Sequence, residues 1–148
     1  MKNIRVVITG MGVVAPNGVG LPSFEEAIRE GKSGIRYFEE FKEKNFSCCI
    51  GGQPEVSEGK MLEYLTPLQL RNFNSWGILY GCMAGMDAWK DAGLEFNEDK
   101  ADFDSACIFG TGISGVEKMA EATYKIDHGK VRRPVSYTHL TLPTIYSV

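Results

Sequence analysis

Residues 5–17, RVVITGMGVVAPN, indicate the fold class of this chain. The first half is β-branched and almost wholly apolar after Arg5, which is typical of a strand covered on both faces. Gly10, Gly12 and Ala15 then follow in a G-x-G-x-x-A spacing, which is how a dinucleotide-binding turn begins. The stretch therefore predicts a buried strand at Ile4–Thr9, in either a nucleotide-binding fold or another α/β fold.

The residues after this turn argue against a nucleotide site. A dinucleotide fold opens its helix inside the glycine turn, because the helix amides hold the pyrophosphate. Here the turn-forming run Pro16–Gly18 comes first, and Ser23 and Glu26 in PSFEEAIREG form an S-x-x-E capping box that predicts a later helix start. Gly31 ends that helix. An NAD-dependent oxidoreductase is thus a weak alternative that rests on glycine spacing alone.

Bulk composition predicts an ordered, globular, cytoplasmic protein. The chain has 148 residues, of which 43% are hydrophobic and 24% charged, enough apolar material for an ordinary core. A net charge of −3 argues against nucleic-acid binding. No secretory signal is visible, and no run approaches the roughly 18 apolar residues of a membrane span. The four cysteines lack a C-x-x-C pair, so we expect free thiols and no metal site: Cys48, Cys49, Cys82 and Cys107.

Residues 66–94, TPLQLRNFNSWGILYGCMAGMDAWKDAGL, carry the clearest helix signals. Thr66 and Gln69 form a capping box with a proline between them, and Gly93 stops the helix. The region also has glycines every four residues. Since glycine inside a helix costs about 1 kcal/mol relative to alanine, we expect this stripe to pack closely against another backbone: Gly77, Gly81 and Gly85.

Residues 105–129 repeat the order of strand, glycine turn and helix. Ser105–Phe109 reads as a strand parallel to Ile4–Thr9, residues 110–115 as the turn, and the rest as a helix that His128 closes. A short strand is also expected near residues 47–52. The sequence thus predicts an α/β fold, a mixed sheet with packed helices. Four residues of the last helix are expected to face inward: Val116, Met119, Ala120 and Thr123.

The residues alone identify no catalytic group. Cys82 and Cys107 read as small buried hydrophobes, and His139 has no acidic or cysteine partner nearby in sequence. Zinc-protease, phosphate-loop and serine-hydrolase motifs do not occur.

Four stretches together resemble the N-terminal part of a β-ketoacyl-acyl carrier protein synthase, in order and spacing: RVVITGMGVVAPNG, FEEAIREGKSGI, LRNFNSWGILYGCMAGMDAWKDAGL and FGTGISGVEKM. The resemblance covers residues 4 to about 134. It implies an incomplete thiolase-like fold, whose intact form has two similar α/β halves and dimerises. It also implies a reaction in which a family cysteine accepts an acyl chain from acyl carrier protein, and malonyl carrier protein is decarboxylated and condensed with it.

The resemblance places none of the family's catalytic residues in this chain, and it implies no cofactor. It matches Gly112 and Ile113 to a turn that lines the acyl pocket. We therefore expect the chain by itself to be inactive. We also expect it to be poorly soluble, because it would expose sheet edges and apolar surface that the missing half covers. The alternative from another class is a non-catalytic partner of the same fold that sets chain length. The residue at the nucleophile position of the intact protein distinguishes the two.

Residues 135–148, VSYTHLTLPTIYSV, depart from the family pattern and resemble a translated sequencing adaptor. We expect residues 1–134 to be the partial ketosynthase domain and residues 135–148 to be a non-native tail. Within the tail, Pro143 cannot donate to a strand ladder.

Overall fold

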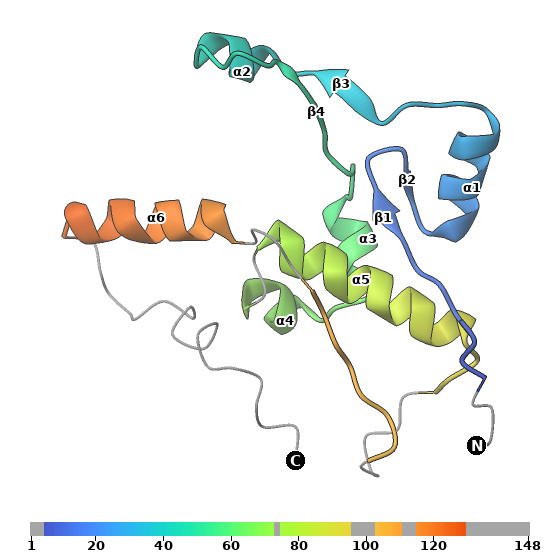
Figure 1. Ribbon diagram of the computed structural model, residues 1–148. Coiled ribbons are helices and arrows are strands. Elements are labelled where there is room, and N and C mark those ends of the chain that lie inside the picture. Colours follow the sequence, from blue (N-terminus) through green and yellow to red (C-terminus); the bar gives the residue numbers. More distant parts are fainter. Residues whose placement is uncertain (1–4, 73–74, 96–102, 111–114, 130–148) are drawn as a thin grey trace.

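The computed structural model describes residues 5–72, 75–95, 103–110 and 115–129, and places helix α5 (Trp76–Asp91) at the centre (Figure 1). The N-terminal segment crosses α5, residues 103–110 lead up to α5 and meet it at Phe109, and α6 (Val116–Asp127) extends away from the first turn of α5. The site described below is built on α5.

A hairpin follows the N-terminal segment. Strands β1 (Val14–Ala15) and β2 (Gly18–Val19) pair antiparallel around Pro16 and Asn17, which confirms the predicted turn. Helix α1 (Leu21–Arg29) comes next and ends at Gly31, as predicted, where φ is 67°.

The predicted capping box of α1 is wrong. The helix begins two residues before Ser23, after Gly20, which has a φ of 86°. Pro22 occupies the first turn, where its fixed φ favours an early start and its missing N–H costs nothing.

An arm projects at the top of Figure 1. Strands β3 (Ile35–Tyr37) and β4 (Ile50–Gly52) pair antiparallel, and the short helix α2 (Glu39–Glu43) lies between them. The rings of Phe38 and Phe41 stack with centroids 5.0 Å apart. Strand β4 confirms the strand predicted near residues 47–52.

Helices α3 (Glu58–Leu62) and α4 (Pro67–Asn72) precede α5. The capping box of α4 is confirmed, since the Thr66 N–H donates to Gln69 Oε1 at 2.8 Å and the Gln69 N–H donates to Thr66 Oγ1 at 3.3 Å. The predicted continuous helix is nevertheless divided. Ser75 has extended backbone, with φ −94° and ψ 130°, and α5 starts after it.

The core joins α3 to α5. Four buried apolar residues form it: Met61, Leu65, Leu79 and Met83. Gly93, with a φ of 71°, ends α5 as predicted.

The two predicted parallel strands are not present as strands. Among the described residues the sheets are the two antiparallel pairs β1–β2 and β3–β4. Val6 is 91% exposed and Ile108 is 92% exposed. A β-branched run favours extended backbone, but a strand also needs a neighbour to complete its ladder, and the described part of the chain supplies none.

The inward face predicted for α6 is also wrong. The four residues that were predicted to face inward are all exposed, and the exposed fraction of Met119 is 62%. The helix buries no side chain. Its boundaries and its C-cap at His128 are confirmed. In the described ranges no helix is long and apolar enough to cross a membrane.

Candidate functional site

The N-terminal segment contacts one side of α5 through its glycines. A Cβ added to Gly10 would lie 2.8 Å from Ala92 Cβ, and one added to Gly12 would lie 2.9 Å from Asp87 Cβ. The N–H of Met11, between them, donates to Asp91 Oδ2 at 2.9 Å. The two glycines of the G-x-G spacing therefore allow a close approach to α5 in this structure.

The glycine stripe of α5 receives the second segment. A Cβ added to Gly85 would lie 2.8 Å from Phe109 Cζ, and one added to Gly81 would lie 3.7 Å from Phe109 Cε1. Close packing is thus confirmed for Gly85, whereas a Cβ at Gly81 would make an ordinary contact. The predicted backbone partner is wrong, because an aromatic ring occupies that place. Gly77 is exposed.

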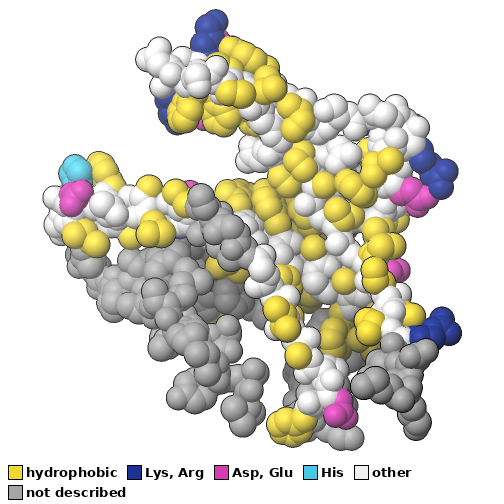
Figure 2. Space-filling view, viewed as in Figure 1, with side chains coloured by type: hydrophobic (Ala, Val, Ile, Leu, Met, Phe, Trp, Pro, Cys, Tyr) yellow, Lys and Arg dark blue, Asp and Glu magenta, His cyan; other side chains and the backbone are white. Residues whose placement is uncertain are grey.

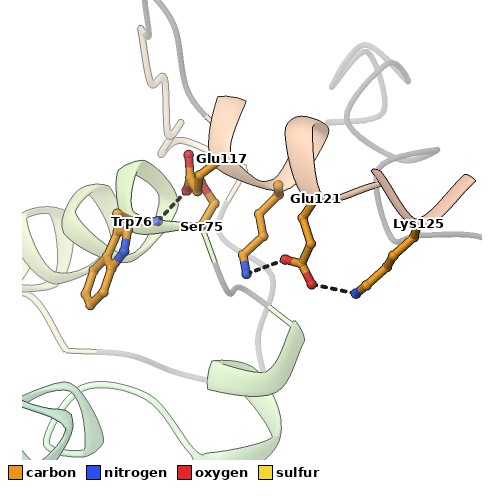
Figure 3. Close-up of polar contacts among 6 residues, drawn as sticks. Ser75, Trp76, Glu117, Glu121 and Lys125 are labelled. Carbon is orange, nitrogen blue, oxygen red and sulfur yellow. Dashed lines mark hydrogen bonds and ion pairs between the residues drawn. The ribbon is translucent and has the colours of Figure 1, made fainter. Parts of the chain in front are cut away.

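The first turn of α6 is attached to the start of α5 by a carboxylate (Figure 3). Ser75 Oγ donates to Glu117 Oε1 at 3.0 Å, and the Trp76 N–H donates to the same oxygen at 3.2 Å. Ser75 is only 1% exposed. Its side chain does not cap its own helix, and the carboxylate from α6 takes that role.

Hydrogen bonding favours the charged form of this carboxylate. The Glu117 backbone N–H, the Ser75 hydroxyl and the Trp76 N–H lower the pKa of Glu117, with a smaller contribution from Lys118, while desolvation opposes them. One turn further on, Glu121 pairs with Lys118 at 3.0 Å and Lys125 at 2.5 Å (Figure 3).

These contacts attach both flanks of the stretch 110–115 to α5. Phe109 holds the upstream flank on Gly85, and Glu117 holds the downstream flank at Ser75. Gly112 and Ile113, the residues matched to the acyl pocket, lie outside the described residues. Sequence reasoning missed Glu117, because the two bonded residues lie 42 positions apart and no local motif joins them.

The thiols and the described histidine show no nucleophilic pairing. All four cysteines are free. Burial, and then Cys107, raise the pKa of Cys82, whereas a nucleophilic thiol needs a lowered pKa. Cys107 is exposed, contrary to its predicted burial, because none of the described strands covers its segment.

The ring of His128 stacks on Tyr124 with centroids 4.0 Å apart, and its Nδ1 lies 2.8 Å from Tyr124 O. His139 lies outside the described residues. The described chain has no group of three or more potential metal ligands.

A hollow of about 750 Å³ lies on the arm, lined in part by Arg36, Phe38 and Phe41. The Arg36 guanidinium lies 5.1 Å from the centre of the Phe38 ring and pairs with Glu55. Apolar side chains gather over this arm in the space-filling view (Figure 2). The sequence predicted no site here, because the residues that line the hollow form no recognised motif.

Residues 3–147 match the family model described as Beta-ketoacyl synthase, N-terminal domain. The chain therefore belongs to the β-ketoacyl synthase family, and its fold is of the α/β class. The family resemblance deduced from the four sequence stretches is confirmed.

The individual relatives are synthases. The chain is 38% identical over 136 residues to the 3-oxoacyl-[acyl-carrier-protein] synthase 2 of Vibrio harveyi, covering 92% of this chain and 32% of the relative. It is 37% identical over 117 residues to the protein of that name from Vibrio cholerae, and the match covers 79% of this chain and 27% of the relative. It is 30% identical over 133 residues to the protein of that name from Synechocystis, and the match covers 89% of this chain and 31% of the relative. The chain thus spans about a third of the length of these relatives.

The range of the family match includes residues 135–147, which were expected to be foreign. These residues lie outside the described part of the structure, and their origin stays a prediction.

Proposed function

We propose that the chain is the N-terminal part of a 3-oxoacyl-[acyl-carrier-protein] synthase, which condenses acyl and malonyl carrier-protein thioesters in fatty-acid or polyketide synthesis. The observation that carries this proposal is the similarity to synthases over most of the chain, 92% of it for the Vibrio harveyi protein. The intact protein would have a thiolase-like fold of two α/β halves.

The chemistry requires groups that this chain does not supply. A cysteine thiolate takes the acyl group from the carrier-protein thioester and releases the carrier thiol. Malonyl carrier protein then loses CO₂, and its carbanion attacks the acyl-enzyme thioester, which forms the carbon–carbon bond and frees the cysteine. The raised pKa of Cys82 argues against this thiol as the nucleophile.

The contribution of this chain is to the acyl-binding side. Gly112 and Ile113 would line the acyl pocket, where a branched aliphatic side chain suits a fatty chain. Acyl carrier protein would be the substrate partner, and the intact protein would be a homodimer. The four free thiols fit a reducing cytoplasm.

The test is to recover the uninterrupted gene, express its product and assay condensation of acyl and malonyl carrier-protein thioesters. Product formation that is lost when the downstream nucleophilic cysteine becomes alanine supports a synthase. A protein with another residue at that position, which condenses nothing alone but alters the product length of a synthase partner, would instead be the chain-length-setting alternative.

The 148-residue chain alone should be inactive in the same assay. Condensation by the purified short chain would contradict this division of roles. Sequencing the source DNA through SYTHLTLPT tests whether residues 135–148 are foreign.

A further inference from the structure

Cys82 lies at the edge of the face of α5 that receives residues 103–110. It directly follows Gly81 and lies one turn before Gly85, and residues three and four apart share a face of a helix. The ring of Phe109 lies over these two glycines, 2.8 Å from a Cβ added to Gly85 and 3.7 Å from one added to Gly81. Cys82 itself is half-buried and packs against the core cluster. Its thiol is therefore beside the place where the second segment meets α5.

Cys107 approaches this place along the second segment. Residues 105–110 contain no turn or bend, and they lead up to α5 as an extended run (Figure 1). Side chains of an extended chain alternate between two sides: Ile108 is 92% exposed, whereas the ring of Phe109 contacts α5. Cys107 lies two residues before Phe109, so its side chain is on the side that faces α5, while its thiol stays exposed.

The electrostatics of Cys82 agree with this placement. Burial raises the pKa of Cys82, and Cys107 raises it further, because a like charge nearby disfavours the thiolate. A disulfide needs the two Cα atoms within about 7 Å of each other. In the described part of the chain the segment belongs to no sheet, so no strand ladder opposes the small movement that would bring the two sulfurs into contact.

We propose that Cys82 and Cys107 are a redox-sensitive pair, whose disulfide closes across the contact between α5 and residues 103–110 and clamps that segment to the helix. Both cysteines are free in this structure, which is the reduced form of the pair. Disulfides of cytosolic proteins are usually transient or redox-sensing. The inference does not depend on the proposed function, because described residues of this chain alone form the pair.

The oxidant is a low-molecular-weight disulfide such as oxidised glutathione. The thiolate of exposed Cys107 attacks one sulfur of the oxidant, whose S–S bond breaks, so that one glutathione leaves and the other stays on Cys107 as a mixed disulfide. Cys82 then loses its proton and attacks the Cys107 sulfur, which forms the protein disulfide and releases the second glutathione. The two cysteines together lose two electrons and two protons, and the oxidant gains them as two thiols.

The test uses the reduced 148-residue chain in a glutathione buffer. Free thiols are then alkylated, and the chain is digested with trypsin and analysed by mass spectrometry without reductant. The expected product joins the peptide of residues 72–90, which holds Cys82, to that of residues 101–118, which holds Cys107. The other two cysteines share a third peptide, so any other pairing has a different mass. A main product that involves another cysteine, or a link between two chains on a non-reducing gel, overturns the proposal.

Two variants separate the roles of the thiols. Cys82→Ser lacks the thiol that displaces the second glutathione, so Cys107 should retain about fivefold more glutathione than in the parent. Cys49→Ser is the matched control and should form the same link as the parent. Equal amounts of glutathione on Cys107 in Cys82→Ser and in the parent overturn the proposal. In urea the parent should lose its preference for this link, and an unchanged preference would contradict a role for the folded contact.

The clamp is measured by chymotrypsin cleavage after Phe109, which is 62% exposed. Oxidation should slow this cleavage about fivefold, because a protease cuts a segment that has left its contact with the fold. Reductant should restore the original rate, and Cys49→Ser should respond to oxidation like the parent. A cleavage rate that oxidation leaves unchanged overturns the clamp.

Discussion

Helices α5 and α6 differ sharply in what they bury. α5 carries Leu79 and Met83, which are 6% and 0% exposed, and it receives chain segments on two sides. α6 has an amphipathic sequence, yet it buries no side chain. The comparison teaches that periodicity shows which face of a helix can be buried, whereas burial itself requires a partner in the structure.

The largest expected effect tests this contrast directly. Met83→Ala should lower the free energy of unfolding by about 2–5 kcal/mol, because it opens a cavity in the core. Met119→Ala, the same change on the exposed face of α6, should stay within about 0.5 kcal/mol of the parent. Urea denaturation followed by circular dichroism measures both. Equal losses would show that α6 is packed as tightly as α5.

The second prediction concerns the close approach to α5. Gly12→Ala should cost about 1–3 kcal/mol, because its Cβ would press on the backbone of α5 at Ala84. Gly110→Ala is the control, since nothing lies within 4 Å of its added Cβ. The denaturation midpoints of the two variants can be compared. A neutral Gly12→Ala would mean that the segment does not rest on the helix.

A third pair of variants measures a contribution local to one helix. Thr66→Ala should cost about 1 kcal/mol, because it removes the acceptor for the Gln69 N–H. Ser23→Ala should cost under about 0.5 kcal/mol, because α1 begins before it. Melting temperatures of the two variants provide the comparison. If Ser23→Ala lowered the melting temperature more than Thr66→Ala, the capping box predicted from the sequence for α1 would be supported.

The smallest effect is the pH dependence of the contact between the two helices. The pKa of Glu117 is lowered in the folded chain, so its contribution is complete above the unfolded value of about 4.3 and is lost as pH falls through the folded pKa. Because Glu117 is exposed, solvent screening should keep the effect below about 1 kcal/mol.

The amide chemical shift of Trp76, followed as the pH falls below about 4, is the measurement for this last effect. Glu117→Gln should abolish its titration. A parent shift that stays constant over this range would contradict the contact.

Features set by neighbouring residues were predictable from the sequence. The capping box at Thr66 and the helix ends at Gly31 and Gly93 each follow from the chemistry of one turn. The break before α5 was also within reach, since Asn74 and Ser75 are residues that favour helix starts.

Contacts between distant residues were not predictable in the same way. The bond from Ser75 to Glu117 joins positions 42 apart, and neither residue carries a signal for the other. The strands foreseen at residues 4–9 and 105–109 failed for a related reason, because composition indicates a preference for burial and not the presence of a neighbour. The acyl-pocket residues Gly112 and Ile113 came from the family resemblance alone.

The hydrogen bond from the Met11 N–H to Asp91 has a consequence for synthesis on the ribosome, because its two ends are 80 residues apart. At roughly 5–20 residues per second, the acceptor is made roughly 4–16 seconds after the donor. During that interval the segment around Gly10 and Gly12 has no helix to pack against. Completion of α5 ends this interval for the two glycines, but Val6 and Ile8 stay 91% and 86% exposed in the folded chain, so the apolar run before them remains open after α5 is made.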